Sequence, residues 1–165
     1  MVILVTGGSS SGKSAFAEQV AVSLPAPHVY AATMRHGDGE TEARIRKHRA
    51  MRAGKGFHTV ELACSPHGFA PVSGTVLLED LSNLVVNGCA HLLPAVLASD
   101  NVVVVANEIG ADGARYDEFT LGFIEQLGSL ACGIAARADV VLEVVAGLPI
   151  ALKGELPVTA ACSGR

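Results

Sequence analysis

Short runs of Val, Ile and Leu alternate with helix-forming stretches along most of the chain. Within each run the apolar residues are consecutive, which is typical of strands buried on both faces of a parallel sheet. The intervening stretches are long enough for the helices that connect such strands. The pattern therefore predicts an α/β fold, with helices on both faces of a mostly parallel sheet. The predicted strands are Val2–Thr6, His28–Thr33, Thr75–Asp80, Asn101–Asn107 and Val140–Ala146, with an edge strand at Leu148–Leu152, and the predicted helices are Lys13–Ser23, Glu40–Ala53, Ser82–Ala98 and Asp117–Ala138.

The domain organisation expected from this pattern is simple. A chain of 165 residues fits one compact domain, and we assign residues 1–153 to a single domain. The segment Cys64–Gly74 is rich in Pro, Gly and Ser and predicts a surface loop. The last residues, 154–165, predict a loosely held tail.

Composition and charge narrow the class of protein. Half of the residues are hydrophobic and 17% are charged, which is typical of a folded chain. The net charge of −4 gives no basic field for nucleic acid. No apolar run approaches the length of a membrane span, the N-terminus lacks the pattern of a signal peptide, and the four cysteines lack zinc spacing. We therefore expect a cytoplasmic protein without a nucleic-acid partner or a membrane span.

The clearest motif is a phosphate loop between the first predicted strand and the first predicted helix. It matches G-x-x-x-x-G-K-[ST], and its glycines let successive backbone N–H groups face one phosphate at a helix N-terminus. The lysine would reach the β- and γ-phosphates, and the last serine could ligate Mg²⁺. The alternative is a chance Gly/Ser-rich turn, which the strand before it and the helix after it disfavour. The predicted phosphate-binding residues are Gly7, Gly8, Ser9, Ser10, Ser11, Gly12, Lys13 and Ser14.

Acidic residues end two of the predicted strands. Glu79 and Asp80 follow the run Thr75–Leu78, and Glu108 follows the strand that ends at Asn107. A phosphoryl-transfer enzyme needs a carboxylate near its metal ion, and strand ends lie beside the phosphate loop in such a sheet. The alternative is a polar residue that simply ends a strand. We assign the predicted metal site to Ser14 and Glu79.

Half of the twelve Lys and Arg residues fall within the predicted helix Glu40–Ala53 and the two residues after it. At helical spacing Arg44, His48 and Arg52 share one face, so two guanidinium groups would flank one imidazole. Nearby cations favour the neutral imidazole and would hold a polyphosphate, which suits a histidine that attacks phosphorus. The alternative is a solvated basic face with a spectator histidine, and these residues alone favour that interpretation.

Together these motifs resemble the bifunctional adenosylcobinamide kinase / adenosylcobinamide-phosphate guanylyltransferase family of cobalamin biosynthesis. The resemblance runs from Ile3 to about Lys153. Beyond the phosphate loop, it depends on R-I-x-x-H-R-x-x-R at residues 44–52, T-x-E at 59–61, N-E-I-G at 107–110 and V-A-G-L-P at 145–149.

The resemblance implies a RecA-like P-loop NTPase fold, a homo-oligomer (a trimer) and two reactions. The first phosphorylates adenosylcobinamide with GTP or ATP. The second transfers GMP from GTP, through a guanylylated His48, to adenosylcobinamide phosphate, with Mg²⁺ as cofactor. The implied GTP contacts beyond the phosphate loop are Ala32, Thr33, Met34, Arg49, Ala50, Met51, Arg52, Glu61 and Glu79. The alternatives are a plain P-loop small-molecule kinase, in which His48 is a spectator, and a GTP-binding regulatory module without enzymatic activity.

Overall fold

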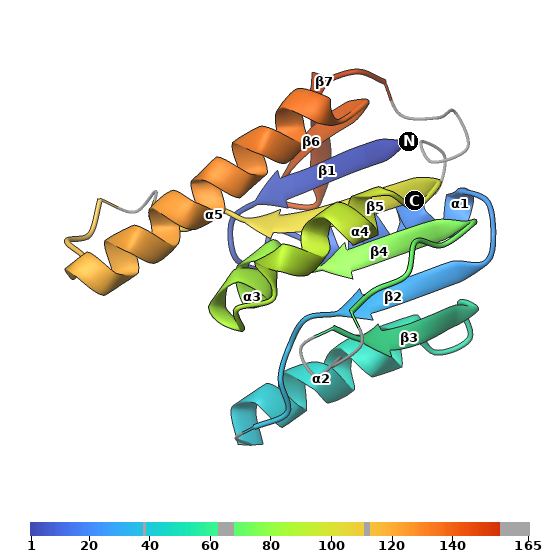
Figure 1. The fold of residues 1–165 in the computed structure, drawn as a ribbon, viewed down its shortest axis with the longest axis horizontal. Helices are drawn as coiled ribbons and strands as arrows, with labels where there is room; N and C mark the ends of the chain where they lie inside the picture. Colours follow the sequence, from blue (N-terminus) through green and yellow to red (C-terminus); the bar gives the residue numbers. More distant parts are fainter. Residues whose placement is uncertain (38, 63–67, 111–112, 156–165) are drawn as a thin grey trace.

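A computed structural model describes residues 1–37, 39–62, 68–110 and 113–155, with the Met51 side chain left out. Seven strands form one sheet in the order β3-β2-β4-β5-β1-β6-β7 (Figure 1). The strands are β1 (Val2–Gly7), β2 (His28–Ala32), β3 (Phe57–Glu61), β4 (Thr75–Glu79), β5 (Asn101–Asn107), β6 (Val140–Val145) and β7 (Leu148–Lys153). The helices are α1 (Lys13–Ser23), α2 (Gly39–Arg52), α3 (Leu81–Val86), α4 (Leu93–Leu97) and α5 (Glu118–Arg137), with a 3₁₀ turn, η1 (Ala90–Leu92), before α4.

Every neighbouring pair in the sheet is parallel except β6 and β7, which form an antiparallel hairpin. Strand β5 lies between β1 and β4, and Gly7 at the end of β1 is in register with Asn107 at the end of β5. The carboxyl ends of β1, β4 and β5 therefore meet at one edge of the sheet. The predicted α/β fold with a mostly parallel sheet is confirmed.

An apolar core lies on each face of the sheet, between the sheet and its helices. Alternate residues of each central strand pack into opposite cores. On β1, Ile3 and Val5 pack with the apolar side of α1, whereas Leu4 packs with residues of α3, α4 and α5. The run of Val residues on β5 divides in the same way. Helix α1 therefore covers one face of the sheet and α3, α4 and α5 cover the other (Figure 1).

Two elements differ from the sequence prediction. The single helix predicted over Ser82–Ala98 is wrong, because the chain leaves α3 at Asn87 and Gly88 takes a positive φ of 69°. Pro94 then starts α4 after η1, as proline suits the first turn of a helix but not its interior. Strand β3 was not predicted, because its short run of partly exposed residues, including His58 and Thr59, lacks the continuous apolar pattern of the other parallel strands.

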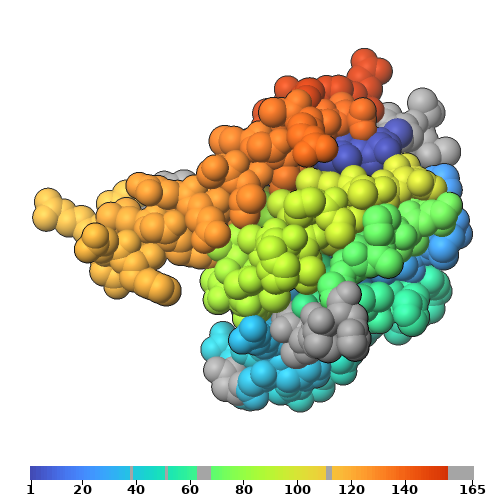
Figure 2. Space-filling model, in the orientation of Figure 1, coloured from blue at the N-terminus to red at the C-terminus, as the bar shows by residue number. Residues whose placement is uncertain are grey.

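Helix α5 matches the prediction to within one residue at each end, with Asp117 as its N-cap. It projects from the body of the molecule (Figure 2). Of its residues only Leu127 and Ile134 are buried, and Phe119 is 88% exposed. Among the described residues, α5 is the one helix that is long and apolar enough to cross a membrane by length and composition. The buried core helix of a soluble protein can pass the same test.

The predicted edge strand at Leu148–Leu152 is present as β7. Of the predicted loop Cys64–Gly74, residues 64–67 lie outside the described part of the chain, and so do residues 156–165 of the predicted tail.

Candidate active site

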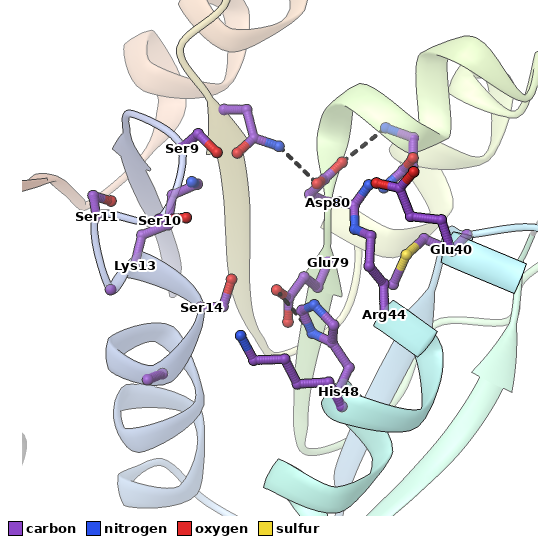
Figure 3. Close-up of a pocket in the computed structure, with 16 residues that line it drawn as sticks. Ser9, Ser10, Ser11, Lys13, Ser14, Glu40, Arg44, His48, Glu79 and Asp80 are labelled. Atoms are coloured by element: carbon purple, nitrogen blue, oxygen red, sulfur yellow. Dashed lines mark hydrogen bonds and ion pairs between the residues drawn. The ribbon is translucent and has the colours of Figure 1, made fainter. Parts of the chain in front are cut away.

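The turn between β1 and α1 forms one wall of a cavity with a volume of about 550 Å³ (Figure 3). Gly12 caps α1 in the left-handed conformation, with φ 93° and ψ 0°, and the Ser11 N–H donates to the Gly8 carbonyl. The Lys13 Nζ donates to the same carbonyl at 2.9 Å. All of the residues from Ser9 to Ser14 line this cavity. The turn therefore presents backbone N–H groups, hydroxyls and one ammonium group to a single space.

Lys13 is buried, with 6% of its surface exposed. Burial lowers the pKa of its ammonium group, and the nearby acids Asp80, Glu79 and Glu108 oppose this effect in that order. Glu79 and Asp80 end β4, and Glu108 follows β5. The acids at the strand ends thus help to keep this lysine charged in a site that takes it out of water.

Glu79 forms the floor of the cavity and is 3% exposed. Its Oε2 accepts from the Tyr30 hydroxyl at 3.2 Å, and its carboxylate accepts from Ser14. Burial raises the pKa of Glu79, but the contacts with His48, Ser14 and Tyr30 together hold it below its ordinary value. The carboxylate is therefore ionised at neutral pH. For Tyr30, burial and then the Glu79 charge raise the pKa well above its usual range, so the phenol stays neutral and donates.

The neighbouring acid, Asp80, has different partners. Its Oδ1 accepts from the Asn83 backbone N–H at 2.8 Å and from the Ser82 hydroxyl at 2.9 Å, which caps α3. Its Oδ2 accepts from the Asn107 amide at 2.7 Å. The Thr33 hydroxyl donates to the Glu79 and Asp80 carbonyls and accepts from the Asp80 N–H, so the backbone that carries both acids is held in place.

Helix α2 forms the opposite wall of the cavity. Arg44, Lys47 and His48 line it from this side, together with Glu40 (Figure 3). Helix α2 has Glu40 and Glu42 in its first turn and two arginines in its last, which complements the helix dipole. It contributes Ile45 to the buried residues, so most of its surface faces solvent. The groups that this wall offers are thus side chains and not backbone.

His48 lies between α2 and the floor, and its side chain is 18% exposed. Its Nδ1 is 3.4 Å from the Glu79 Oε1, an ion-pair distance, and this nitrogen has no hydrogen-bond partner among the described residues. The charged group that the structure pairs with this imidazole is therefore a carboxylate on β4, whereas Arg44 lines the first cavity with His48 and Arg52 lines the second. A helical-wheel argument shows only the neighbours on the same helix, and Glu79 comes from another element.

Arg52 turns away from the main cavity. Its guanidinium lies 3.4 Å from the centre of the Tyr30 ring, a cation–π contact, and only 8% of the residue is exposed. Its Nη1 is buried without a hydrogen-bond partner among the described residues. Arg52 lines a second, small cavity of about 10 Å³ beside the first, together with His48, Arg49, Glu61 and Met34.

A chain of exposed charged groups runs along this second cavity. Glu42 contacts the His36 Nδ1 at 2.8 Å, the His36 Nε2 is 3.4 Å from the Arg49 guanidinium, and Arg49 is 3.5 Å from Glu61. His36 carried no signal in the sequence analysis, because its partners lie on α2 and the histidine itself lies between β2 and α2. No described histidine, cysteine, aspartate or glutamate belongs to a cluster of three that would bind a metal ion by itself.

The structure brings most of the predicted site residues together. Ser9–Ser14 of the predicted phosphate loop, His48 and Glu79 line the first cavity, but Gly7 and Gly8 do not. The second cavity is lined by Ala32, Thr33, Arg49, Arg52 and Glu61, and Met34 lines both. Ala50 is exposed on α2 and lines neither of them. The Met51 side chain lies outside the described residues. Sequence reasoning did not assign a role to Tyr30, which contacts both Glu79 and Arg52; its signal was a lone polar aromatic residue in an otherwise aliphatic strand.

Comparison with known proteins identifies the family of this chain. The chain is 34% identical to the bifunctional adenosylcobalamin biosynthesis protein CobP of Pseudomonas aeruginosa, an alignment that covers 92% of this chain and 97% of the relative. It is 30% identical to the bifunctional adenosylcobalamin biosynthesis protein CobU of Salmonella typhimurium, over 93% of this chain and all of the relative. The family profile described as cobinamide kinase / cobinamide phosphate guanyltransferase matches residues 3–152. The chain therefore belongs to the cobinamide kinase / cobinamide phosphate guanyltransferase family.

Proposed function

We propose that this protein phosphorylates adenosylcobinamide and then transfers GMP from GTP to adenosylcobinamide phosphate, through a guanylylated His48, to give adenosylcobinamide-GDP. The observation that carries the proposal is that His48 lines the same cavity as Ser9–Ser14 of the turn. A triphosphate held by the turn would have the imidazole beside it. The names of the family and of its two relatives support both reactions.

The pairing of His48 with Glu79 suggests which ring nitrogen reacts. The negative charge of the carboxylate favours the tautomer with its proton on Nδ1, the nitrogen that faces it. The lone pair is then on Nε2, and Glu79 acts as the group that orients the ring. Nε2 attacks the α-phosphorus of GTP, an N–P bond forms, the bond to the bridging oxygen of the β-phosphate breaks, and pyrophosphate leaves.

The second half of the transfer returns the enzyme to its starting state. A phosphate oxygen of adenosylcobinamide phosphate attacks the same phosphorus, the N–P bond breaks, and a diphosphate linkage forms. In the kinase reaction the hydroxyl of adenosylcobinamide takes the γ-phosphoryl group and a nucleoside diphosphate leaves. Lys13, Arg44 and Lys47, which line the cavity, would balance the charge of the phosphates in both reactions.

Ser14 and Glu79 fit the Mg²⁺ ion that these reactions use. Their side chains are within hydrogen-bond reach of each other, so one ion could contact both oxygens. Magnesium sites in nucleotide enzymes need only one or two such protein ligands, because phosphates and water supply the others. When bound, Mg²⁺ neutralises charge on the phosphate oxygens.

The nucleoside part of GTP is assigned to the second cavity. The unpaired Arg52 Nη1 is a buried donor there, and Glu61 supplies an acceptor at the end of β3. The cavity is small because Arg49 and Arg52 line it, and exposed Arg49 can move to admit a ligand.

Intact-mass spectrometry after incubation with GTP and Mg²⁺ tests the proposal. We expect one added GMP on the wild-type protein and none on His48→Ala. His91→Ala is the matched control, since His91 is exposed on η1 and does not line the cavity. If the wild-type protein phosphorylates adenosylcobinamide but never carries GMP, the plain kinase is the correct interpretation.

We also infer that the protein is a cytoplasmic homo-oligomer, as the family resemblance implies. The exposed apolar side chains near the start of α5, Phe119 and Leu121, support this inference, since such a projecting apolar helix is costly in water. Sedimentation analysis of the wild type and of Phe119→Ser tests it. A trimer that the substitution weakens supports the inference, and a wild-type monomer contradicts it.

A further inference from the structure

The β6–β7 hairpin contacts the phosphate loop directly. Its turn consists of Ala146 and Gly147, both with positive φ (50° and 81°), between the paired residues Val145 and Leu148. Such a two-residue turn with positive φ at both positions is a common way to close a tight hairpin. The Gly147 N–H donates to the Ser11 carbonyl at 2.8 Å. The turn of the hairpin is thus hydrogen-bonded to a residue that lies more than a hundred positions earlier in the chain.

This hydrogen bond determines which way the Ser11–Gly12 peptide faces. In a planar trans peptide, the C=O and the following N–H point in opposite directions. The Ser11 carbonyl points to Gly147, so the Gly12 N–H points away from the hairpin, and Gly12 itself lines the cavity. If this peptide rotated, a carbonyl oxygen would take the place of an N–H donor, and it would repel a phosphate.

The hairpin also explains why two residues of the motif are glycine. A Cβ atom on Gly12 would lie 3.2 Å from the Gly147 Cα, and a Cβ atom on Gly7 would lie 2.5 Å from the Val144 carbonyl oxygen. By contrast, a Cβ atom on Gly8 would meet nothing within 4 Å. Close packing of the loop against β6 and the turn, and not only room for a ligand, requires glycine at positions 7 and 12.

The other end of the hairpin is held as well. The Lys153 Nζ, at the end of β7, donates to the carbonyls of Ala135 and Ala136 at 3.0 Å, and these are among the last carbonyls of α5. Strand β7 is exposed along its length, so these contacts, and its pairing with β6, hold it in place. The Gly147 N–H is therefore attached to a fixed support.

From these contacts we propose that the backbone N–H of Gly147 is a positioning group for nucleotide binding. It holds the Ser11–Gly12 peptide so that the Gly12 N–H faces the phosphates. This inference rests on the proposed role of the Gly7–Ser14 turn in binding phosphate. It assigns a function to the V-A-G-L-P segment, which lies outside the cavity itself.

Replacing the Gly147 amide with an ester tests the proposal, because an ester removes the N–H and keeps the shape of the chain. Cys132 provides a ligation junction, so residues 132–165 can be made by synthesis and joined to expressed residues 1–131 before refolding the full chain. The reference is the all-amide protein made in the same way. D-Alanine at position 147 is the matched control, since it keeps the N–H and suits a positive φ.

The first measurement is the dissociation constant for pyrophosphate and for GTP. We expect the ester to weaken both about tenfold, as the loss of one hydrogen bond allows, and D-alanine to restore the affinity of the all-amide protein. Equal affinities of the ester and the all-amide protein would overturn the proposal. If the all-amide protein binds neither ligand, the proposed function itself fails.

The second measurement separates positioning from general stability. With ¹⁵N-labelled glycine in residues 1–131, the Gly12 amide resonance of the all-amide protein should shift on addition of pyrophosphate. In the ester protein we expect a different starting position and a smaller shift. In the unmodified protein, the Gly147 amide should exchange with solvent at least tenfold more slowly when pyrophosphate is bound. If pyrophosphate leaves this exchange unchanged or accelerates it, the proposal is wrong, whether or not the ester protein refolds.

Discussion

The two walls of the cavity are built in opposite ways. The turn between β1 and α1 presents backbone groups, and its shape depends on close packing against β6 and the β6–β7 hairpin. Helix α2 presents the side chains Arg44, Lys47 and His48 from a mostly exposed surface. Changes to the turn should therefore affect stability and binding together. Changes to α2 should affect chemistry and binding and leave stability almost unchanged. Glu79, on the floor, contacts both walls.

The largest effect is expected at the floor. Glu79→Gln keeps the size of the side chain but removes the charge that faces the His48 Nδ1 and accepts from Ser14. We expect the rate of guanylylation to fall on the order of 10³-fold, as in other histidines that lose an orienting carboxylate. Single-turnover labelling with α-labelled GTP measures it. Glu125→Gln, an exposed acid on α5 that lines neither cavity, is the control. A loss of less than tenfold would remove Glu79 from the mechanism.

The second effect tests the packing of the turn. Gly7→Ala places a Cβ atom 2.5 Å from a backbone oxygen, at a residue whose φ is 148°. We therefore expect the free energy of unfolding to fall by about 3 kcal/mol and GTP binding to be lost. Gly8→Ala, one residue later, should change stability by less than about 0.5 kcal/mol. Urea unfolding of both variants checks this. Similar stabilities would mean that the hairpin does not constrain the turn.

Tyr30→Phe tests how the floor is supported from β2. The substitution removes the hydroxyl that donates to the Glu79 Oε2 and leaves the ring beneath Arg52. Because the lost hydrogen bond is made to a buried charge, we expect the free energy of unfolding, measured in urea, to fall by about 1.5 kcal/mol. The same substitution in a Glu79→Gln background is the control, because the charge that accepts the hydrogen bond is then absent. Equal losses in the two backgrounds would show that the Tyr30 hydroxyl adds nothing specific at the floor.

A smaller effect is expected on the pH dependence of stability. The pKa of Glu79 lies below its ordinary value of 4.5 in the folded protein, so its ionised form stabilises the fold above that pH. This contribution is lost as the pH falls from 4.5 through the lowered pKa. Burial raises the pKa of Glu79 and so opposes the contacts that lower it, which makes the net change of stability with pH modest. Unfolding measured from pH 6 to pH 3 should be less steep for Glu79→Gln than for the wild type, and identical slopes would contradict this account.

The smallest effect on stability is expected at α2. Arg49 is 53% exposed and lies 3.5 Å from Glu61, so Arg49→Met should change the free energy of unfolding by less than about 0.5 kcal/mol. If Arg49 contacts the nucleotide, the KM for GTP should nevertheless rise severalfold. Arg46→Met, on the same helix but outside both cavities, is the control for KM. If Arg49→Met lowered the stability and left the KM for GTP unchanged, the distinction drawn between the two walls would be wrong.

Local patterns were enough to predict most of the fold. The apolar runs of β1, β2, β4, β5 and β6 are buried on both faces, and such runs form parallel strands almost wherever they occur. The phosphate-loop motif and the cationic helix were also visible, because residues adjacent in sequence or one helical turn apart make them. The resemblance to a family added the expectation that His48 is guanylylated and that Glu61 contacts GTP, which spacing alone did not supply.

What the chain's pattern determined by itself is therefore local: the strands, the glycine-serine turn and the face of α2 that carries Arg44 and His48. Only the tertiary structure decided which residues from separate elements meet. It placed Glu79 of β4 against His48, Arg52 over Tyr30 and the Gly147 N–H against the Ser11 carbonyl. The physical reason is that these contacts depend on strand order and on how helices lie across the sheet, and neither leaves a periodic signal in the sequence.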